Sequence, residues 1–264
     1  MSRDTIVLDV SDSVATVTID DPDRYNPLTR EAYAALLEAF DDVEASDARV
    51  LVIQGAGDAF SAGGDVEDMK ESLDSRPPAA EEIDHIREHE QEAIARVVDL
   101  SVPTVAKVDG PATADGAALA VACDATLASE RARLGFTHAR FGLSLDAGAS
   151  WLLPRLVGEK MALELAMTGR MVDAEEADEL GLVNHVYPHD EFEARCEEYV
   201  AGLAEGPPLA LPHVKRLVRR GTDRPLDEAL DEEASVQAAM FATDDYEEGV
   251  RAFLEKRDPE FRGT

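Results

Sequence analysis

The sequence has almost no cysteine and no long apolar run. Only Cys123 and Cys196 occur in its 264 residues, too few for a disulfide framework or a cysteine-rich metal site. Both lie in helix-like apolar patterns, so we expect buried free thiols. No stretch of about 18 apolar residues is present, so we expect no membrane span. Residues 1–4 lead directly into a strand pattern and leave no room for a signal peptide, which predicts a cytoplasmic protein.

Positive charge is also scarce. The chain carries 56 acidic and 25 basic residues, a formal net charge of −31, and only five of the basic residues are lysines. The acids are spread along the whole length, which indicates a solvated acidic surface rather than an interaction tail. We interpret this surface as adaptation to a cytoplasm of high salt (a halophilic protein), where screening reduces self-repulsion. The same charge repels nucleic acids and anionic membranes, so we expect neither as a partner.

Common metal and phosphate motifs are missing. The sequence contains no His-Glu-x-x-His, no Cys-x-x-Cys and no phosphate-loop Gly-Lys-Ser/Thr. Gly55-Ala56-Gly57 starts like a dinucleotide fingerprint, but Phe60 stands where the third glycine belongs. We therefore expect no metal site and no bound dinucleotide.

The order of the expected elements predicts an α/β protein with a helical C-terminal part. Alternating apolar and polar residues predict a hairpin of Thr5–Val10 and Val14–Ile19. Thr29 is placed to cap a helix that reaches about Glu44. Apolar runs predict buried strands at Val50–Gln54, Thr104–Val108 and Ala125–Ala128, and from Asp190 onward the pattern is helical throughout.

Three further segments have simple local interpretations. Lys70–Ala80 contains two prolines and no periodicity, so we expect a mobile loop. Glu81–Leu100 has one apolar stripe and is expected to be a single long helix. The last helix, Asp244–Lys256, is expected to open with the capping box Asp244-x-x-Glu247.

Two turns of small residues follow two of the expected strands. One is Ala62-Gly63-Gly64-Asp65, and the other is Ala114-Asp115-Gly116 at the start of a small-residue helix. N–H groups at a helix start have no partner within the helix and lie at its positive end. If the turns face each other, the N–H groups of Gly64 and Asp115 can hold one oxyanion. Ordinary glycine turns are the alternative interpretation.

Motifs along nearly the whole chain resemble the crotonase (enoyl-CoA hydratase/isomerase) superfamily. The resemblance implies a spiral of ββα units in residues 1–200 and a helical trimerisation region in residues 201–264, with homotrimers that often pair into hexamers. The motifs are Phe60–Asp65, Val105–Gly110, Cys123-Asp124, Gly169-Arg170-x-x-Asp173-Ala174, Glu179–Val183 and Glu248–Arg257.

The resemblance implies that two backbone N–H groups stabilise a thioester enolate. The substrate would be an acyl-CoA thioester, so coenzyme A enters as part of the substrate and no separate cofactor is expected. The two donors correspond to Gly64 and Asp115. This sequence departs from the family at Asp115, where a run of glycines is usual. An acid beside a forming oxyanion is unfavourable unless its side chain points away.

The reaction depends on further side chains. Hydratases of the family use two glutamates, and the corresponding positions hold Ala118 and His138. A methyl group cannot transfer a proton, so two-glutamate hydration of a 2-enoyl-CoA is disfavoured. His138 could act as a non-standard base in a hydratase, or it could be structural. A non-catalytic acyl-CoA-binding subunit is a further alternative.

A different acid is available at Asp146. The segment Gly142–Arg155 is similar to the branch that contains the phenylacetate-pathway and Δ3,Δ2-enoyl-CoA isomerases. In that branch the acid at the position of Asp146 shuttles a proton, so the resemblance favours an isomerase. The alternative is that Asp146 only caps the helix that follows.

The resemblance also implies residues that bind CoA. Arg24 would lie near the phosphates. Trp151 is not among these residues, because we interpret it as a core residue rather than a platform for the substrate. The other positions implied for CoA are Ala62, Asp65 and Val66 along the adenine and pantetheine path, and Phe253 and Lys256 on the last helix.

The interpretation as adaptation to high salt predicts unfolding when the protein is diluted into low salt. Without screening, the repulsion among carboxylates destabilises the compact state. Circular dichroism along a series of decreasing salt concentrations would follow the loss of structure, and full stability at low salt would contradict the interpretation.

Overall fold

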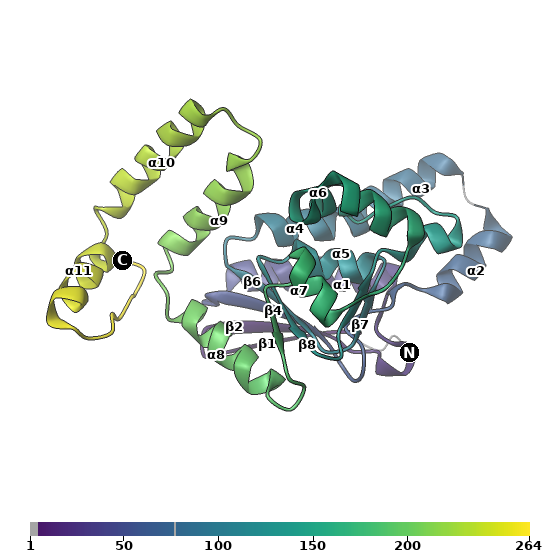
Figure 1. Ribbon diagram of the computed structural model, residues 1–264, viewed down its shortest axis with the longest axis horizontal. Helices are drawn as coiled ribbons and strands as arrows, with labels where there is room; N and C mark the ends of the chain where they lie inside the picture. The colour runs from purple at the N-terminus through teal and green to yellow at the C-terminus, as the bar shows by residue number, and fades with distance from the viewer. Residues whose placement is uncertain (1–4, 77) are drawn as a thin grey trace.

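The computed structural model describes residues 5–76 and 78–264 (Figure 1). Met1-Ser2-Arg3-Asp4, on which the expectation about a signal peptide rests, lies outside the described residues. Strands alternate with helices as far as Tyr187, and helices alone follow in the described chain. The prediction of an α/β protein with a helical C-terminal part is therefore confirmed.

A six-stranded sheet forms the centre of the molecule. Its strands are β1 (Ile6–Ser11), β2 (Val14–Ile19), β4 (Val50–Gly55), β6 (Thr104–Val108), β8 (Ala125–Ser129) and β11 (His185–Tyr187), adjacent in this order. β1 and β2 form the predicted antiparallel hairpin, and each later strand joins in parallel. Parallel neighbours require crossover connections, which the intervening helices provide.

Two smaller sheets fix the chain where it leaves the central strands. β3 (Pro27–Leu28) pairs in parallel with β5 (Gly63–Gly64), which follows β4. β9 (Arg133–Gly135) lies between the parallel β7 (Pro111–Thr113), which follows β6, and the antiparallel β10 (Val172–Asp173). These short pairings place both small-residue turns at the same end of the central sheet.

Alternate residues of the central strands face two different cores, as the pleat of a strand requires. In β4, Leu51 and Ile53 belong to the main core, whereas Val50 and Val52 face the second. α8 (Phe192–Ala204) covers the second core (Figure 1). The main core is covered by α1 (Arg30–Ala45), α4 (Glu92–Asp99), α5 (Asp115–Ala122), α6 (Ala149–Thr168) and α7 (Ala174–Leu180).

Local sequence and packing agree in α1. The side chain of Thr29 accepts a hydrogen bond from the N–H of Ala32 at 3.1 Å, which is the predicted N-cap. Every third or fourth residue after it is buried against the sheet, including Leu36 and Phe40. Both cysteines are buried free thiols, as expected.

Three helices continue beyond the sheet: α9 (Ala210–Gly221), α10 (Leu226–Met240) and α11 (Asp244–Glu255). Figure 1 shows them extending to one side of the molecule, away from α2 (Val66–Ser75) and α3 (Ala79–Ile86). The exposed apolar residues of α9 and α10 show that this chain alone does not cover them. The division at residue 200 stays a prediction.

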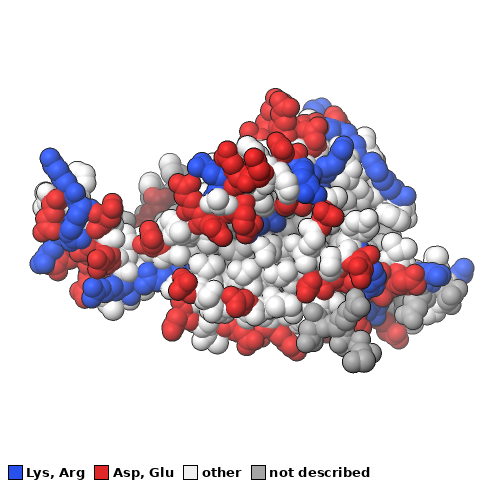
Figure 2. All heavy atoms as spheres, turned by 90° about the horizontal axis from the view of Figure 1, so that it is seen from below, with Lys and Arg blue, Asp and Glu red and all other residues white. Residues whose placement is uncertain are grey.

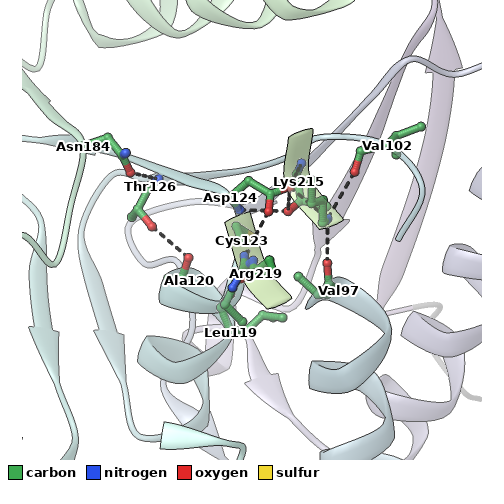
Figure 3. A network of polar contacts seen from close by, with 12 residues as sticks. Val97, Val102, Leu119, Ala120, Cys123, Asp124, Thr126, Asn184, Lys215 and Arg219 are labelled. Carbon is green, nitrogen blue, oxygen red and sulfur yellow. Dashed lines mark hydrogen bonds and ion pairs between the residues drawn. The ribbon is translucent and has the colours of Figure 1, made fainter. Parts of the chain in front are cut away.

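Ionic contacts fasten α9 to the core around Asp124 (Figure 3). Asp124 Oδ2 accepts from the N–H of Thr104 at 2.9 Å and lies 2.8 Å from Lys215 Nζ. Its Oδ1 accepts from Arg219 Nη2 at 2.9 Å. Burial lowers the pKa of Lys215, and the adjacent Asp124 carboxylate opposes that shift. A nearly buried cation needs such a partner, so this network fixes where the C-terminal helices leave the core.

The expected loop at Lys70–Ala80 is wrong, because α2 and α3 occupy most of it. Pro78 is the N-cap residue of α3. Proline is tolerated at a helix start, where a missing N–H costs no intrahelical bond. Pro78 therefore begins a helix instead of marking an irregular loop. Pro77, the other proline of the expected loop, lies outside the described residues.

Two helix predictions also need correction. Glu81–Leu100 is not one regular helix, because a π-helical turn at Arg87–Gln91 separates α3 from α4. The last helix does not open with the expected capping box. Thr243 is its N-cap, and the Thr243 hydroxyl accepts from the N–H of Tyr246 at 3.2 Å.

Acidic side chains are distributed along the face shown in Figure 2, with uncharged surface between them. This distribution matches the dispersed acids of the sequence. Adaptation to high salt itself stays a prediction. Of the helices in the described chain, none is both long enough and apolar enough to span a membrane.

Candidate active site

The two small-residue turns lie against each other. The N–H of Thr113 donates to the carbonyl of Ser61 at 2.9 Å, and Ser61 forms a parallel bridge with Ala112. A Cβ on Gly63 would lie 2.5 Å from the carbonyl oxygen of Thr113. A Cβ on Gly116 would lie 2.7 Å from Ser61. Only glycine permits these approaches, so the glycines bring the backbone of β5 to the start of α5.

Buried polar groups hold the first turn in place. Asn26 is fully buried, and its Nδ2 donates to the carbonyls of Ala56 and Ala59 at 2.8 and 2.7 Å. The Ser61 hydroxyl donates to the carbonyl of Asn26 at 2.7 Å and accepts from the N–H of Gly63 at 3.1 Å. Because these buried groups have partners, the turn is fixed without help from a ligand.

The second turn depends on an unusual backbone conformation at Ala114. Its φ of 49° and ψ of −117° lie where an L-residue is strained, at a cost of about 1–3 kcal/mol. The N–H of Ala114 donates to the carbonyl of Gly135 at 2.7 Å, which supports this geometry. Asp115 becomes the first residue of α5, where an N–H has no partner within the helix. The structure thus brings β5, which contains Gly64, to the start of α5, where a Cβ on Gly63 would lie 3.3 Å from the backbone nitrogen of Asp115.

The side chain of Asp115 is held by two donors. Its Oδ2 accepts from the Tyr33 hydroxyl at 3.1 Å, and its Oδ1 lies 2.9 Å from Nε2 of His138. Tyr33 is buried in the core, and burial followed by the Asp115 charge raises its pKa well above the usual value, so the hydroxyl keeps its proton. The Asp115 carboxylate, which the sequence places beside the expected oxyanion donor, is therefore directed toward Tyr33 and His138.

His138 lies in the short helix η3 (Thr137–Phe141) and is only 6% exposed. With Asp115 ionised, Nε2 is the nitrogen that carries the proton and donates it. Nδ1 is buried and has no hydrogen-bond partner within the described part of the chain. The contact with Asp115 occupies one ring nitrogen and burial shields the other, so this arrangement suits a residue that orients Asp115.

Asp146 lies in the loop before α6. Its Oδ1 accepts from the N–H of Ala147 at 2.7 Å and from Nε2 of Gln91 at 3.2 Å. The N-cap residue of α6 is Gly148, and no side chain caps this helix end. The alternative that Asp146 caps the helix is therefore wrong.

A cavity of about 380 Å³ opens between α4 and α6, with Asp146 on its wall. The surrounding side chains are largely apolar, and they include Ile94, Val98, Leu145, Trp151 and Leu152. The expectation that Trp151 is a core residue is wrong. It is 37% exposed, lines the cavity and stacks with the Arg155 guanidinium, 3.9 Å from the ring centroid.

Glu90 has a shifted pKa that the sequence reasoning did not anticipate. It lies half-buried in the π-helical turn, and its pKa is raised to about 7. Burial is the largest cause, followed by the charges of Asp115 and Asp146. The sequence offers no signal for it, because Glu90 is one of 56 acids and the π turn that redirects the helix is not visible in the apolar pattern.

The residues implied for CoA near the first turn lie close together. Arg24, in the short helix η1 (Pro22–Arg24), donates to Asp65 Oδ2 at 2.7 Å and to Asp21 Oδ2 at 2.8 Å. The N–H of Ala62 donates to the carbonyl of Tyr25 at 2.8 Å, beside Arg24. Val66 begins α2 and is 63% exposed.

Phe253 and Lys256 are placed elsewhere. Phe253 lies on α11 and is 83% exposed, and Lys256 ends that helix in a left-handed conformation. Figure 1 shows α11 at the end of the molecule opposite α2 and α3. Within one chain, these two residues are therefore not brought to Arg24 or Asp65.

Comparisons with known proteins agree with this architecture. The enoyl-CoA hydratase/isomerase family model matches residues 9–264. A Thermus thermophilus protein, provisionally named an enoyl-CoA hydratase, is 39% identical and is matched over 94% of this chain and 97% of its own. The 1,2-epoxyphenylacetyl-CoA isomerase of Escherichia coli is 33% identical over 98% of each chain. A solved enoyl-CoA hydratase/isomerase from Cupriavidus metallidurans superposes with a TM-score of 0.90, 34% identity and coverage of 100% and 98%.

Replacing Glu90 by glutamine is expected to stabilise the fold above pH 7. The folded pKa of about 7 exceeds the ordinary 4.5, so the contribution of Glu90 is complete below pH 4.5 and is lost as the pH rises through 7. With allowance for partial exposure, we expect a gain of about 1–2 kcal/mol at pH 8 and none near pH 4.5. Thermal unfolding of the wild type and of Glu90→Gln across this pH range measures the difference. A stability difference that does not change with pH would contradict the raised pKa of Glu90.

Proposed function

The chain belongs to the enoyl-CoA hydratase/isomerase family, and on this premise we propose that it is an enoyl-CoA isomerase. The observation that carries the proposal is the position of Asp146. This carboxylate lines the cavity, whereas the two positions for hydratase glutamates hold the buried methyl group of Ala118 and the Asp115-bound His138.

In the proposed reaction, Asp146 removes a proton from C2 of a 3-enoyl-CoA. The negative charge develops on the thioester oxygen, where the N–H groups of Gly64 and Asp115 stabilise it. A proton is then returned at C4, and the double bond becomes conjugated with the thioester. The close approach of β5 to α5 supports this assignment, because a Cβ on Gly63 would lie only 3.3 Å from the backbone nitrogen of Asp115.

The tethered carboxylate of Asp115 is compatible with that oxyanion. Tyr33 and His138 hold it by hydrogen bonds, so its charge is directed away from its own N–H. Hydrogen bonds to a carboxylate also offset part of its charge. In this proposal, Tyr33 and His138 position the carboxylate of Asp115.

Hydration of a 2-enoyl-CoA, with His138 as base, is the second candidate function. The names of relatives favour it as much as they favour an isomerase, because hydratases and isomerases both occur among them. The buried ring of His138 argues against it. A non-catalytic acyl-CoA-binding subunit is the third candidate.

CoA would bind along the first turn, with Arg24 near the phosphates and Ala62, Asp65 and Val66 beside it. Arg24 already pairs with Asp21 and Asp65, which fix its guanidinium while 46% of the side chain stays exposed. The apolar cavity next to Asp146 would take the acyl group.

We also propose that the protein is cytoplasmic.

We also propose that the chain forms a homotrimer or a hexamer. The helices after residue 200 expose apolar side chains that this chain alone does not cover, a pattern typical of an interface. Examples are Val214, Val218, Leu226, Leu230, Phe253 and Leu254. Phe253 and Lys256 would then reach the CoA of a neighbouring subunit, which accounts for their distance from Arg24 in their own chain.

Asp146→Asn is expected to abolish isomerisation of a 3-enoyl-CoA while CoA-thioester binding persists. Loss of a positioned acid–base group costs about 10²–10⁴ in rate. The conversion is followed by the absorbance of the conjugated thioester, with Asp178→Asn on the exposed side of α7 as a matched control. Retained turnover in Asp146→Asn would remove this residue from the mechanism.

The wild-type protein separates the three candidates in the same assay. Hydration of crotonyl-CoA without conversion of a 3-enoyl-CoA would favour the hydratase with His138. Binding of a panel of unsaturated thioesters without turnover would favour the non-catalytic subunit.

Self-association is tested by light scattering coupled to size-exclusion chromatography in high salt. We expect a mass of three or six chains of 28.5 kDa. Leu226→Glu together with Leu230→Glu should lower that mass, because burying a charge at an apolar interface is unfavourable. A wild-type mass of one chain would contradict the proposal.

A further inference from the structure

One aromatic side chain on the wall of the Asp146 cavity is held from behind. Trp151 lies in the first turn of α6, lines the cavity and is 37% exposed. The Arg155 guanidinium lies over the indole, 3.9 Å from the ring centroid. Arg155 itself does not line the cavity, so the part of the ring that it leaves uncovered faces the cavity. The wall therefore presents a flat apolar surface.

Two hydrogen bonds fix the guanidinium of Arg155. Its Nη1 donates to the carbonyl of Trp151 at 3.0 Å, and its Nη2 donates to Asp223 Oδ1 at 2.8 Å. Asp223 lies between α9 and α10, so the C-terminal helical part supports the cavity wall through Arg155. An exposed ion pair contributes little alone, but this guanidinium also stacks on the indole, a contact to which its planar shape is suited.

The cavity follows one face of α4 away from Asp146. Residues at the spacing of a single helix face line it, namely Gln91, Ile94, Ala95, Val98 and Asp99. Gln91 donates to Asp146 at 3.2 Å, so this end of the stripe lies at the carboxylate. At a rise of about 1.5 Å per residue, Asp99 lies about 12 Å farther along the helix. An acyl group with C2 at Asp146 can therefore extend well beyond C4.

The opposite wall comes from the start of α6. A Cβ on Gly148 would lie 3.1 Å from Ile94 Cγ2, so this helix end packs closely against α4. The N–H of Trp151 donates to the carbonyl of Gly148 at 2.9 Å, which places Trp151 one turn after that contact. Leu152 follows it on the same wall. Each methylene group buried in such an apolar slot strengthens binding about fourfold.

We propose that Trp151 is the specificity-determining residue of the acyl site and selects acyl groups whose apolar part extends beyond C4. Arg155 and Asp223 are positioning residues, because they hold the indole against the cavity. This inference rests on the proposed function, in which the cavity takes the acyl group of a 3-enoyl-CoA. The indole contacts the distal part of that group and not the reacting carbons, so it sets the preference among substrates without taking part in proton transfer.

Trp151 is the only tryptophan of the chain, so its fluorescence reports on the cavity directly. The wild type is titrated with dodecanoyl-CoA, which has no double bond to move, and with CoA alone. We expect dodecanoyl-CoA to shift the emission to shorter wavelength, because the acyl chain replaces water at the exposed part of the indole. CoA alone should leave the emission unchanged. The absence of a shift with dodecanoyl-CoA, or an equal shift with CoA, would overturn the proposal.

Trp151→Ala tests the specificity, with Leu156→Ala as the matched control. Leu156 is 40% exposed on the same helix and does not line the cavity. The kcat/KM is measured for a short substrate, 3-hexenoyl-CoA, and a long one, 3-dodecenoyl-CoA. We expect Trp151→Ala to lower the long-substrate value about 10–100-fold, chiefly through KM, and the short-substrate value by no more than about twofold.

Two further variants belong to this measurement. Trp151→Phe should restore most of the preference, because it keeps an aromatic ring at the wall, and Leu156→Ala should match the wild type. An equal loss for both substrates in Trp151→Ala would overturn the proposal, because it would show an effect on folding or on the chemical step instead of specificity.

Asp223→Asn tests the support behind the indole, with Asp227→Asn in the exposed first turn of α10 as its control. Asp223→Asn removes the charge that holds Arg155 and leaves the ring in place. We expect the ratio of the long-substrate to the short-substrate kcat/KM to fall about two- to fivefold in this variant and to stay unchanged in Asp227→Asn. An unchanged ratio in Asp223→Asn would overturn the positioning role.

The specificity and the proposed function fail in different ways. If the wild type isomerises both substrates and Trp151→Ala keeps the wild-type preference, the role of Trp151 is wrong and the isomerase function stands. If the wild type isomerises neither substrate but its emission responds to dodecanoyl-CoA and not to CoA, the isomerase function is wrong and Trp151 still lines an acyl site.

Discussion

The site depends on one steric constraint, the contact between the backbones of two turns about fifty residues apart. Gly63 and Gly116 meet the opposite turn at distances that no Cβ could occupy. A backbone donor is not replaced by changing its side chain, so this contact would fix the geometry of the proposed oxyanion site independently of the side chains around it. The strained φ of Ala114 is tolerated because the pairing of β7 and β9 and the N–H of Ala114 hold the turn on both sides.

A fixed backbone leaves the chemistry to the side chains that surround it. Asp115 lies at the second turn and Asp146 on the wall of the cavity, and the charges of both raise the pKa of Glu90. The positions implied for hydratase glutamates hold Ala118 and His138. Each of the three carboxyl groups has a different environment. Asp115 is bound by Tyr33 and His138, Asp146 accepts two N–H donors, and Glu90 is half-buried beside both charges. Carboxyl groups in different environments can take different roles in proton transfer.

The sequence predicted the elements whose signals are local. Thr29 caps α1 because a threonine at that position needs only the N–H of Ala32, three residues away. The hairpin and the buried strands follow from alternation and apolar runs. The expected loop around Pro78 is wrong because proline breaks a helix and also begins one, and the neighbouring sequence does not distinguish the two cases. The approach of the two turns cannot be predicted from local sequence, since a pairing across about fifty residues has no local signal.

Side-chain direction was beyond the reach of the sequence. Whether Asp115 points at its own N–H or away depends on Tyr33 and His138, which lie 82 and 23 residues away along the chain. Trp151 lines a cavity because α4 leaves space beside α6, and the pKa of Glu90 is raised because burial and the charges of Asp115 and Asp146 disfavour its ionised form. All three outcomes are set by tertiary contacts rather than by residue type. An acidic residue in such an acidic protein gains a chemical role only when the fold places beside it a group that shifts its proton affinity. A single sequence does not show which group that is.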